Sequence, residues 1–224
     1  MKISNETIEV LKNFATINTG IAVKKGDVLH TISPQKNIVA KAKVAETFPL
    51  PFAIYDLTNL LGVISMYKEG AEIEFHEKEL AISGYGGRSH IHYRYTEKNL
   101  IITPPEKDIV LPAEDLVFEL SADDLNHIQR AAGVLQAPQL VIEVSENKLF
   151  VSAVDLQNDA ANVLRFAVGE APGVEDFKAT LRTENMKIMG NTYKVVVSHK
   201  GVVKLTNADD TLTYWIATEK KNGG

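Results

Sequence analysis

The apolar residues near the N-terminus recur at the spacing of an amphipathic helix. Ser4 is placed to cap this helix, because Ile3 before it and Ile8 after it have the spacing of a hydrophobic staple. The apolar side of the helix holds Leu11, Phe14, Ala15 and Ile17, and the opposite side holds Lys12, Asn13 and Thr16. The pattern therefore predicts a helix that is packed on one side only.

A second helix with the same beginning is predicted after residue 120. Ser121 repeats the cap, and Leu120 and Leu125 repeat the staple. The apolar positions of the first helix are then taken by Ile128, Ala132 and Val134, with His127 and Arg130 on the opposite face. The same pattern occurs twice in one chain.

Alternating apolar residues follow each helix and predict antiparallel strands. They cover residues 21–23, 27–32 and 38–44 in the first half, and 140–144, 148–153 and 161–168 in the second. In each half the first two strands stand on either side of a turn, which predicts a hairpin. In each half a further strand then leads into a short helix, capped by Asp56 in the first half and by Thr183 in the second, where it ends near Gly190. A hairpin and a last strand complete each half, so the chain is predicted to be α+β.

A proline-rich segment separates the two halves. Pro104, Pro105 and Pro112 lie in "TPPEKDIVLPAEDLV", and proline lacks the amide hydrogen that a sheet needs. The sequence predicts two domains, residues 1–102 and 118–224, joined by a linker of residues 103–117.

Composition narrows the class of protein. With 224 residues, 45% of them hydrophobic, the chain can form two cores, and the absence of cysteine excludes disulfides, thiolate metal sites and a thiol nucleophile. No apolar run approaches the roughly 20 residues of a membrane span. The net charge of −5 argues against general affinity for nucleic acid, so any DNA contact is expected to be local.

At "LKNFATINTGI", "AIYDL", "LGVIS" and "ENMKIMGNTYKVVV" the chain resembles the sliding clamps of T-even-type bacteriophages. This resemblance implies the DNA-clamp fold, with two similar domains per chain, helices that line a central hole and antiparallel sheets outside. It also implies a homotrimeric ring that encircles double-stranded DNA without reading sequence. The ring would have no catalytic activity and no cofactor. A separate clamp-loader ATPase would load it, it would tether DNA polymerase, and it would act in the cytoplasm of an infected bacterial cell.

Two sets of candidate site residues go with this resemblance. The cations expected on the inner wall are Lys12, Arg130 and Lys187, followed by Lys24, Lys25, Lys178 and Arg182. A single lysine or arginine on a helix is usually just solvated, so the set carries more weight than any member. An outer pocket for a partner peptide is expected at Ile109, Val110, Leu111 and Pro112, with Tyr214 or Trp215 opposite. The alternative is that one of the two aromatic residues belongs to the core.

An alternative function rests on histidines. His90 and His92 fall on one face of a predicted strand, and His76 could join them, which is a spacing that can hold a metal in a β-rich hydrolase. No acid or cysteine stands at a supporting spacing, so solvent-facing histidines without a metal are the expected outcome. The chain also lacks the GxxxxGK[ST] loop and the G-x-S-x-G turn, which predicts a protein that neither uses ATP nor catalyses a reaction.

Overall fold

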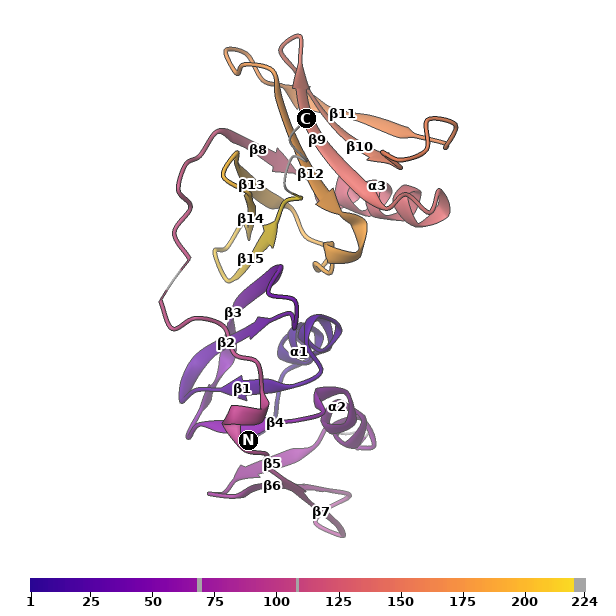
Figure 1. Ribbon diagram of the computed structural model, residues 1–224. Coiled ribbons are helices and arrows are strands. Elements are labelled where there is room, and N and C mark those ends of the chain that lie inside the picture. Colours follow the sequence, from indigo (N-terminus) through magenta and orange to yellow (C-terminus); the bar gives the residue numbers. More distant parts are fainter. Residues whose placement is uncertain (68–69, 108, 220–224) are drawn as a thin grey trace. The chain divides into compact units, whose positions relative to one another are not determined.

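The fold was analysed in a computed structural model, which describes residues 1–67, 70–107 and 109–219 (Figure 1). The chain divides into two compact units, unit 1 (Met1–Lys107) and unit 2 (Asp108–Gly224). The division falls inside the predicted linker, and the exact limits of the two predicted domains stay a prediction. Each unit is described by itself below.

Unit 1 is built from two helices and seven strands of the described residues. In chain order they are α1 (Asn5–Ile17), β1 (Ile21–Val23), β2 (Gly26–Ile32), β3 (Ile38–Phe48), β4 (Phe52–Ile54), α2 (Leu57–Ser65), β5 (Glu72–Phe75), β6 (Glu79–Gly84) and β7 (Ser89–Arg94), followed by a 3₁₀ turn at Lys98–Leu100. All ladders are antiparallel: β1 pairs with β4, β2 with β3, and β6 lies between β5 and β7.

Unit 2 repeats much of this plan, with a single α-helix among its described residues. Its elements are β8 (Leu116–Leu120), α3 (Ala122–Val134), β9 (Gln139–Ser145), β10 (Lys148–Val154), β11 (Leu164–Glu170), β12 (Phe177–Arg182), the 3₁₀ turn η2 (Thr183–Asn185), β13 (Tyr193–Ser198), β14 (Val202–Asn207) and β15 (Leu212–Ala217). One sheet has the order β11-β10-β9-β12, and in a second ladder β13 and β14 lie between β8 and β15.

The predicted helix starts are confirmed. Ser4 Oγ accepts a hydrogen bond from the Thr7 amide at 3.2 Å, and Ser121 Oγ accepts one from the Asp124 amide at 3.1 Å. Asp56 caps α2 in the same way. Capping is decided by residues three positions apart, so the sequence contains the whole signal.

The apolar sides of α1 and α3 form the cores of their units. Buried residues of the two helices are Leu11, Phe14, Ile17, Leu125, Ile128 and Ala132. In unit 2, Leu125 and Ile128 line a small apolar cavity with Leu140, Ile142 and Leu181, so α3 covers that face of the sheet β11-β10-β9-β12 (Figure 1).

The prediction of a second short helix, from Thr183 to near Gly190, is wrong. Only the 3₁₀ turn Thr183–Asn185 forms, and the backbone from there to β13 is irregular. The Thr183 hydroxyl is not free to cap a helix, because it donates to the carbonyl of Ala137 at 2.7 Å. A contact across 46 residues thus overrides the local signal.

Two further expectations need correction. Val134 does not take the buried position of Ile17, because it stands at the last turn of α3 with 83% of its surface exposed. The strand β1 does not pair with β2, its neighbour in sequence, but with β4, in the register Ala22↔Ala53. In unit 2 the corresponding strands β9 and β10 do form the predicted hairpin.

Candidate nucleic-acid interface and partner pocket

In unit 1 the helices α1 and α2 lie side by side (Figure 1). Their exposed faces carry little positive charge. Lys12 is exposed as predicted, but its Nζ lies 2.7 Å from Glu9 Oε1. The exposed residues of α2 are uncharged: Thr58, Asn59, Gly62 and Ser65. This helical surface therefore offers one lysine that is already paired with an acid.

In unit 2 the structure brings Arg130 and Lys187 to neighbouring elements. Arg130 is exposed on α3, and Lys187 is exposed in the segment that joins η2 to β13. Gln129 Nε2, on the residue before Arg130, donates to the carbonyl of Met186, the residue before Lys187, at 3.1 Å. The two cations thus lie on elements that contact each other. The exposed side of α3 together with this segment is called the helix-side surface of unit 2, and the exposed sides of α1 and α2 form that of unit 1.

The segment that carries Lys187 is held from the core by two tyrosines. The Tyr193 hydroxyl donates to the carbonyl of Met189 at 2.8 Å, and the Met189 amide donates to the Tyr214 hydroxyl at 3.3 Å. Burial raises the pKa of the Tyr193 hydroxyl to about 12, so it stays protonated and able to donate at neutral pH. An irregular segment is in this way fixed where the sequence had suggested a helix.

The prediction that Lys178 and Arg182 lie near the helix-side surface is wrong. In β12 the buried residues Ala179 and Leu181 face α3, and side chains alternate along a strand. Lys178 and Arg182 therefore lie on the sheet face turned away from α3.

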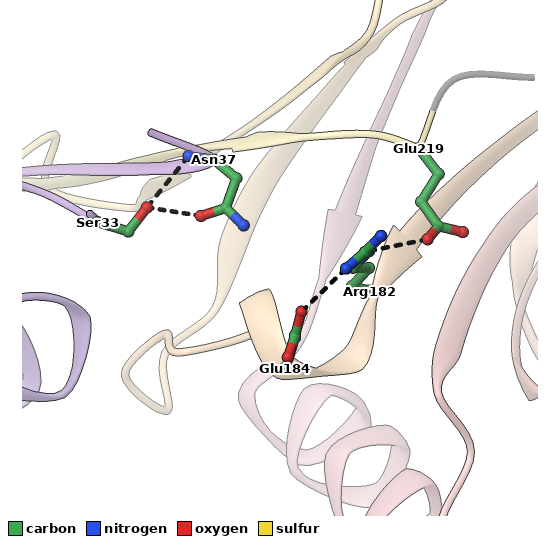
Figure 2. A network of polar contacts seen from close by, with 5 residues as sticks. All are labelled: Ser33, Asn37, Arg182, Glu184 and Glu219. Carbon is green, nitrogen blue, oxygen red and sulfur yellow. Dashed lines mark hydrogen bonds and ion pairs between the residues drawn. The ribbon is translucent and has the colours of Figure 1, made fainter. Parts of the chain in front are cut away.

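Arg182 also forms ion pairs with two acidic side chains. Its Nε lies 3.0 Å from Glu219 Oε1 and its Nη1 lies 3.4 Å from Glu184 Oε1 (Figure 2). Hydrogen bonds to Glu219 and then to Glu184 raise the pKa of the guanidinium. The arginine fastens the segment after β15 to β12, where the Glu219 amide also donates to the Thr180 carbonyl.

Lys24 and Lys25 lie in the exposed turn between β1 and β2 and not on a helix. Lys24 Nζ is 3.7 Å from Glu106 Oε1. Among the described residues Lys25, by contrast, has no ion pair. The remaining strong candidates for the helix-side surface are Lys12, Arg130 and Lys187.

The two aromatic candidates for the partner pocket point to opposite faces of their sheet. Tyr214 is fully buried, pairs in register with Leu205 of the core and packs edge to face on Tyr193, with ring centroids 6.1 Å apart. It belongs to the core, as the alternative expected. Trp215 pairs with Lys204 on the other face and is 8% exposed.

The predicted opposite wall of the pocket is partly open to solvent. Val110 is 84% exposed, Pro112 is exposed, and Ile109 and Leu111 are half-buried. Within the described part of the chain, no hydrogen bond or ring contact joins these residues to Trp215. Trp215 Nε1 is itself buried and, among the described residues, has no hydrogen-bond partner.

The histidines expected in a metal site are engaged in other contacts. His92 Nδ1 lies 2.7 Å from Glu79 Oε1, His90 Nε2 lies 2.7 Å from the Gly87 carbonyl, and His76 pairs with Glu74 at 3.7 Å. The described residues contain no group of three or more His, Asp or Glu side chains that could hold a metal ion. No observation favours the hydrolase alternative.

Comparison with known proteins settles the family. The model of the family described as DNA polymerase processivity factor matches residues 4–103, and that of the gp45 sliding clamp C-terminal domain matches residues 117–220. The sliding clamp of Vibrio phage KVP40 is 31% identical over 98% of this chain and 99% of its own length. The chain belongs to the sliding-clamp family. The clamp of Enterobacteria phage T4 is likewise 31% identical, over 90% of this chain and 89% of its own.

Solved clamp structures share the fold at low sequence identity. The DNA polymerase sliding clamp of Pseudomonas aeruginosa superposes with a TM-score of 0.67 at 11% identity, over 97% of this chain and 63% of that one. PCNA of Thermococcus kodakaraensis gives 0.68 at 13% identity, over 96% of both chains. A. fulgidus PCNA, solved with the C-terminal region of FEN-1 bound, gives 0.68 at 11%, over 99% of this chain and 98% of that one. The α+β clamp fold with two similar domains is thereby confirmed.

Family membership identifies the function. The protein is a non-catalytic, ring-shaped sliding clamp that acts as a processivity factor for DNA polymerase. No helix among the described residues combines the length and the apolar character that crossing a membrane requires. The sequence did not indicate that β7 and β11 stand at edges of their sheets, although the stretch from Arg88 to Arg94, with two arginines, two histidines and no acid, was a usable signal for β7.

Proposed function

We propose that three copies of the chain form a closed ring around double-stranded DNA, that a clamp-loader ATPase opens this ring, and that it tethers DNA polymerase in the cytoplasm of an infected bacterial cell. Family membership supports the proposal. The structural observation that carries it is the state of the strand edges, because a ring needs two different surfaces that fit each other.

Each unit contains a sheet in which one edge is closed and the other is open. In unit 1, Met1 covers β5: the Ile73 amide donates to the Met1 carbonyl and the Met1 ammonium donates to the Ile73 carbonyl, both at 2.8 Å. In unit 2, Glu219 covers β12 through the hydrogen bond that its amide donates to the Thr180 carbonyl at 2.8 Å. Among the described residues β7 and β11 each have a strand neighbour on one side only. An unpaired edge is a template for pairing with another chain.

Pairing β7 of one copy with β11 of the next is head-to-tail. Such a contact uses a different strand of each partner, so it generates a ring when its rotation closes. The half-buried apolar residues Ile91 and Tyr93 on β7 would meet Leu164, Phe166 and Val168 on β11. Among the described residues β8 and β2 also pair with a single strand each, but β8 is five residues long and β2 lies beside β1.

A ring holds DNA by enclosure, so its inner wall needs only weak attraction to phosphates. Bidentate contacts to bases are worth roughly 1–3 kcal/mol each and would halt sliding. The helix-side surfaces exert at most a weak attraction of this kind, since their cations Lys12, Arg130 and Lys187 stand beside the uncharged Asn126 and Gln129 and the exposed acids Glu6, Glu9 and Asp123.

Reversing the charge of Arg130 and Lys187 together should shorten the products of processive synthesis at moderate salt by at least about threefold, because two phosphate-attracting groups per copy become repulsive. The Lys178→Glu/Lys194→Glu variant is the matched control, with the same charge change on sheet faces turned away from α3. Product lengths on a primed circular template, measured beside ring mass, test this assignment. Equal product lengths for the two double variants would refute it.

For the partner pocket we propose Trp215 together with Val110 and Leu111. The Trp215 N–H is a buried donor that a peptide carbonyl could satisfy, and Val110 is an exposed apolar side chain that a partner could cover. A. fulgidus PCNA, which shares the fold, was solved with the C-terminal region of FEN-1 bound, and this supports the proposal that a clamp binds a segment of a partner protein.

The assembly itself is tested by size exclusion with light scattering. The proposal predicts about three times the subunit mass of 24.7 kDa at micromolar concentration. A monomer or a two-fold dimer over the whole accessible concentration range would overturn it.

A further inference from the structure

The open edge of unit 1 is basic. Arg88, His90, His92 and Arg94 are exposed on β7 or directly before it, and no Asp or Glu occurs between Leu80 and Thr96. The adjacent strand β6 contributes one carboxylate, Glu79, which lies opposite Arg94 in the ladder but contacts His92. Within the described residues neither arginine forms an ion pair.

The open edge of unit 2 is flanked by acids. Three exposed or half-exposed carboxylates stand at the two ends of β11: Asp155 and Asp159 in the connection that leads into it, and Glu170 at its last position. None of them forms an ion pair in the described part of the chain. The one cation between residues 155 and 176 is Arg165. Its Cζ lies 3.8 Å from the centre of the Phe150 ring, and its Nη2 lies 3.9 Å from Glu143 Oε2. The guanidinium is therefore already engaged by residues of its own sheet.

The whole units differ in the same direction. Unit 1 has 13 Lys and Arg against 12 Asp and Glu, whereas unit 2 has 11 against 17. A head-to-tail junction brings the slightly positive unit of one copy to the strongly negative unit of the next. Fields of this kind favour the correct encounter and oppose like-with-like contact.

We infer that charge attraction between the β7 cations of one copy and the acids flanking β11 of the next selects the head-to-tail contact and sets how long the ring stays closed. This rests on the proposed ring. Charges on an edge strand also deter pairing of like edges: two β7 edges would bring four arginines together, and two β11 edges would bring six carboxylates together. The partner that fits β7 is therefore a second copy of this chain.

A charge swap tests the inference. The Arg88→Glu/Arg94→Glu variant should be monomeric at concentrations where the natural protein is trimeric, and so should Asp159→Lys/Glu170→Lys. The chain that carries all four changes should regain the trimer, because attraction is restored with the signs exchanged. Sedimentation velocity over a concentration series measures the assembly. For the natural protein, the monomer fraction should rise as the salt concentration is raised from about 0.05 to 0.5 M. The dissociation constant of the trimer should increase at least about tenfold over this range.

The control is Lys36→Glu/Lys107→Glu, an equal charge change at exposed residues of unit 1 away from β7, which should remain trimeric. Circular dichroism shows that each variant is folded. If the Arg88/Arg94 variant stays trimeric, charge does not hold the junction, and the inference falls while the ring stands. If that variant stays trimeric but loses DNA, the basic edge serves phosphates and the inference is equally overturned. If the natural protein is never a trimer, the proposed ring itself fails.

Discussion

Aspartate in place of Leu11 is expected to abolish the native fold of unit 1 at room temperature. Leu11 is 5% exposed and lines the apolar interior of unit 1 beside Leu57 and Leu60 of α2. An unpaired carboxylate there costs several kcal/mol, and the lost burial of the leucine adds about 2 kcal/mol. Because whole domains are stable by roughly 5–15 kcal/mol, the sum removes most or all of the margin.

The neighbouring position supplies the control. Lys12 is 56% exposed and pairs with Glu9, and surface ion pairs are worth at most about 1 kcal/mol. Lys12→Asp should therefore shift the urea midpoint, followed by circular dichroism, only slightly, whereas Leu11→Asp should show no native baseline. Equal stability of the two variants would mean that α1 turns its other face to solvent, and Lys12 would then no longer belong to the proposed inner wall.

Replacing Glu46 with alanine should destabilise unit 1 by about 3 kcal/mol. Glu46 lies on β3, is 9% exposed, and its carboxylate accepts hydrogen bonds from the Ser4 amide and the Thr7 hydroxyl at the start of α1. Hydrogen bonds to a charged group are worth roughly 1.5–3 kcal/mol each, and the substitution leaves both donors without this acceptor. Urea unfolding measures the loss. Glu72→Ala, at an exposed carboxylate of β5, should change stability by less than about 0.5 kcal/mol.

The same carboxylate predicts a pH dependence. Burial alone would raise the pKa of Glu46, but the hydrogen bonds from Thr7 and Ser4 outweigh it and lower the pKa below the ordinary 4.5. A carboxylate with a lowered pKa contributes stability above its unfolded-state pKa and loses it as the pH falls through the folded value. The natural protein should therefore lose more stability below about pH 4.5 than Glu46→Ala does. Parallel pH profiles for the two proteins would contradict this role.

Features that depend on close neighbours in the chain could be predicted from the sequence. The caps Ser4, Asp56 and Ser121 and the buried faces of α1 and α3 are decided within one or two helical turns. The duplicated pattern followed from the same local signals.

Features decided by distant partners could not be predicted. Thr183 was expected to cap a helix, but its hydroxyl contacts Ala137, and Arg182 was expected to face DNA, but it is held by Glu219. Whether Tyr214 or Trp215 faces the core depends on the register with β14, which alternation alone leaves open. The basic composition of β7 can be read from the sequence, but whether this strand is paired on one side or on both depends on every ladder of the sheet.

The central claim is that the protein holds DNA by closure of a ring and not by affinity. The most direct measurement loads the clamp, with a clamp loader and ATP, onto a nicked circular plasmid, passes the complex through gel filtration at about 0.5 M salt, and repeats this after one restriction cut. Enclosure predicts that the clamp elutes with the circle and is lost from the linear DNA, since salt removes phosphate attraction but leaves a topological link intact. Equal retention on circular and linear DNA would show ordinary binding and contradict the account.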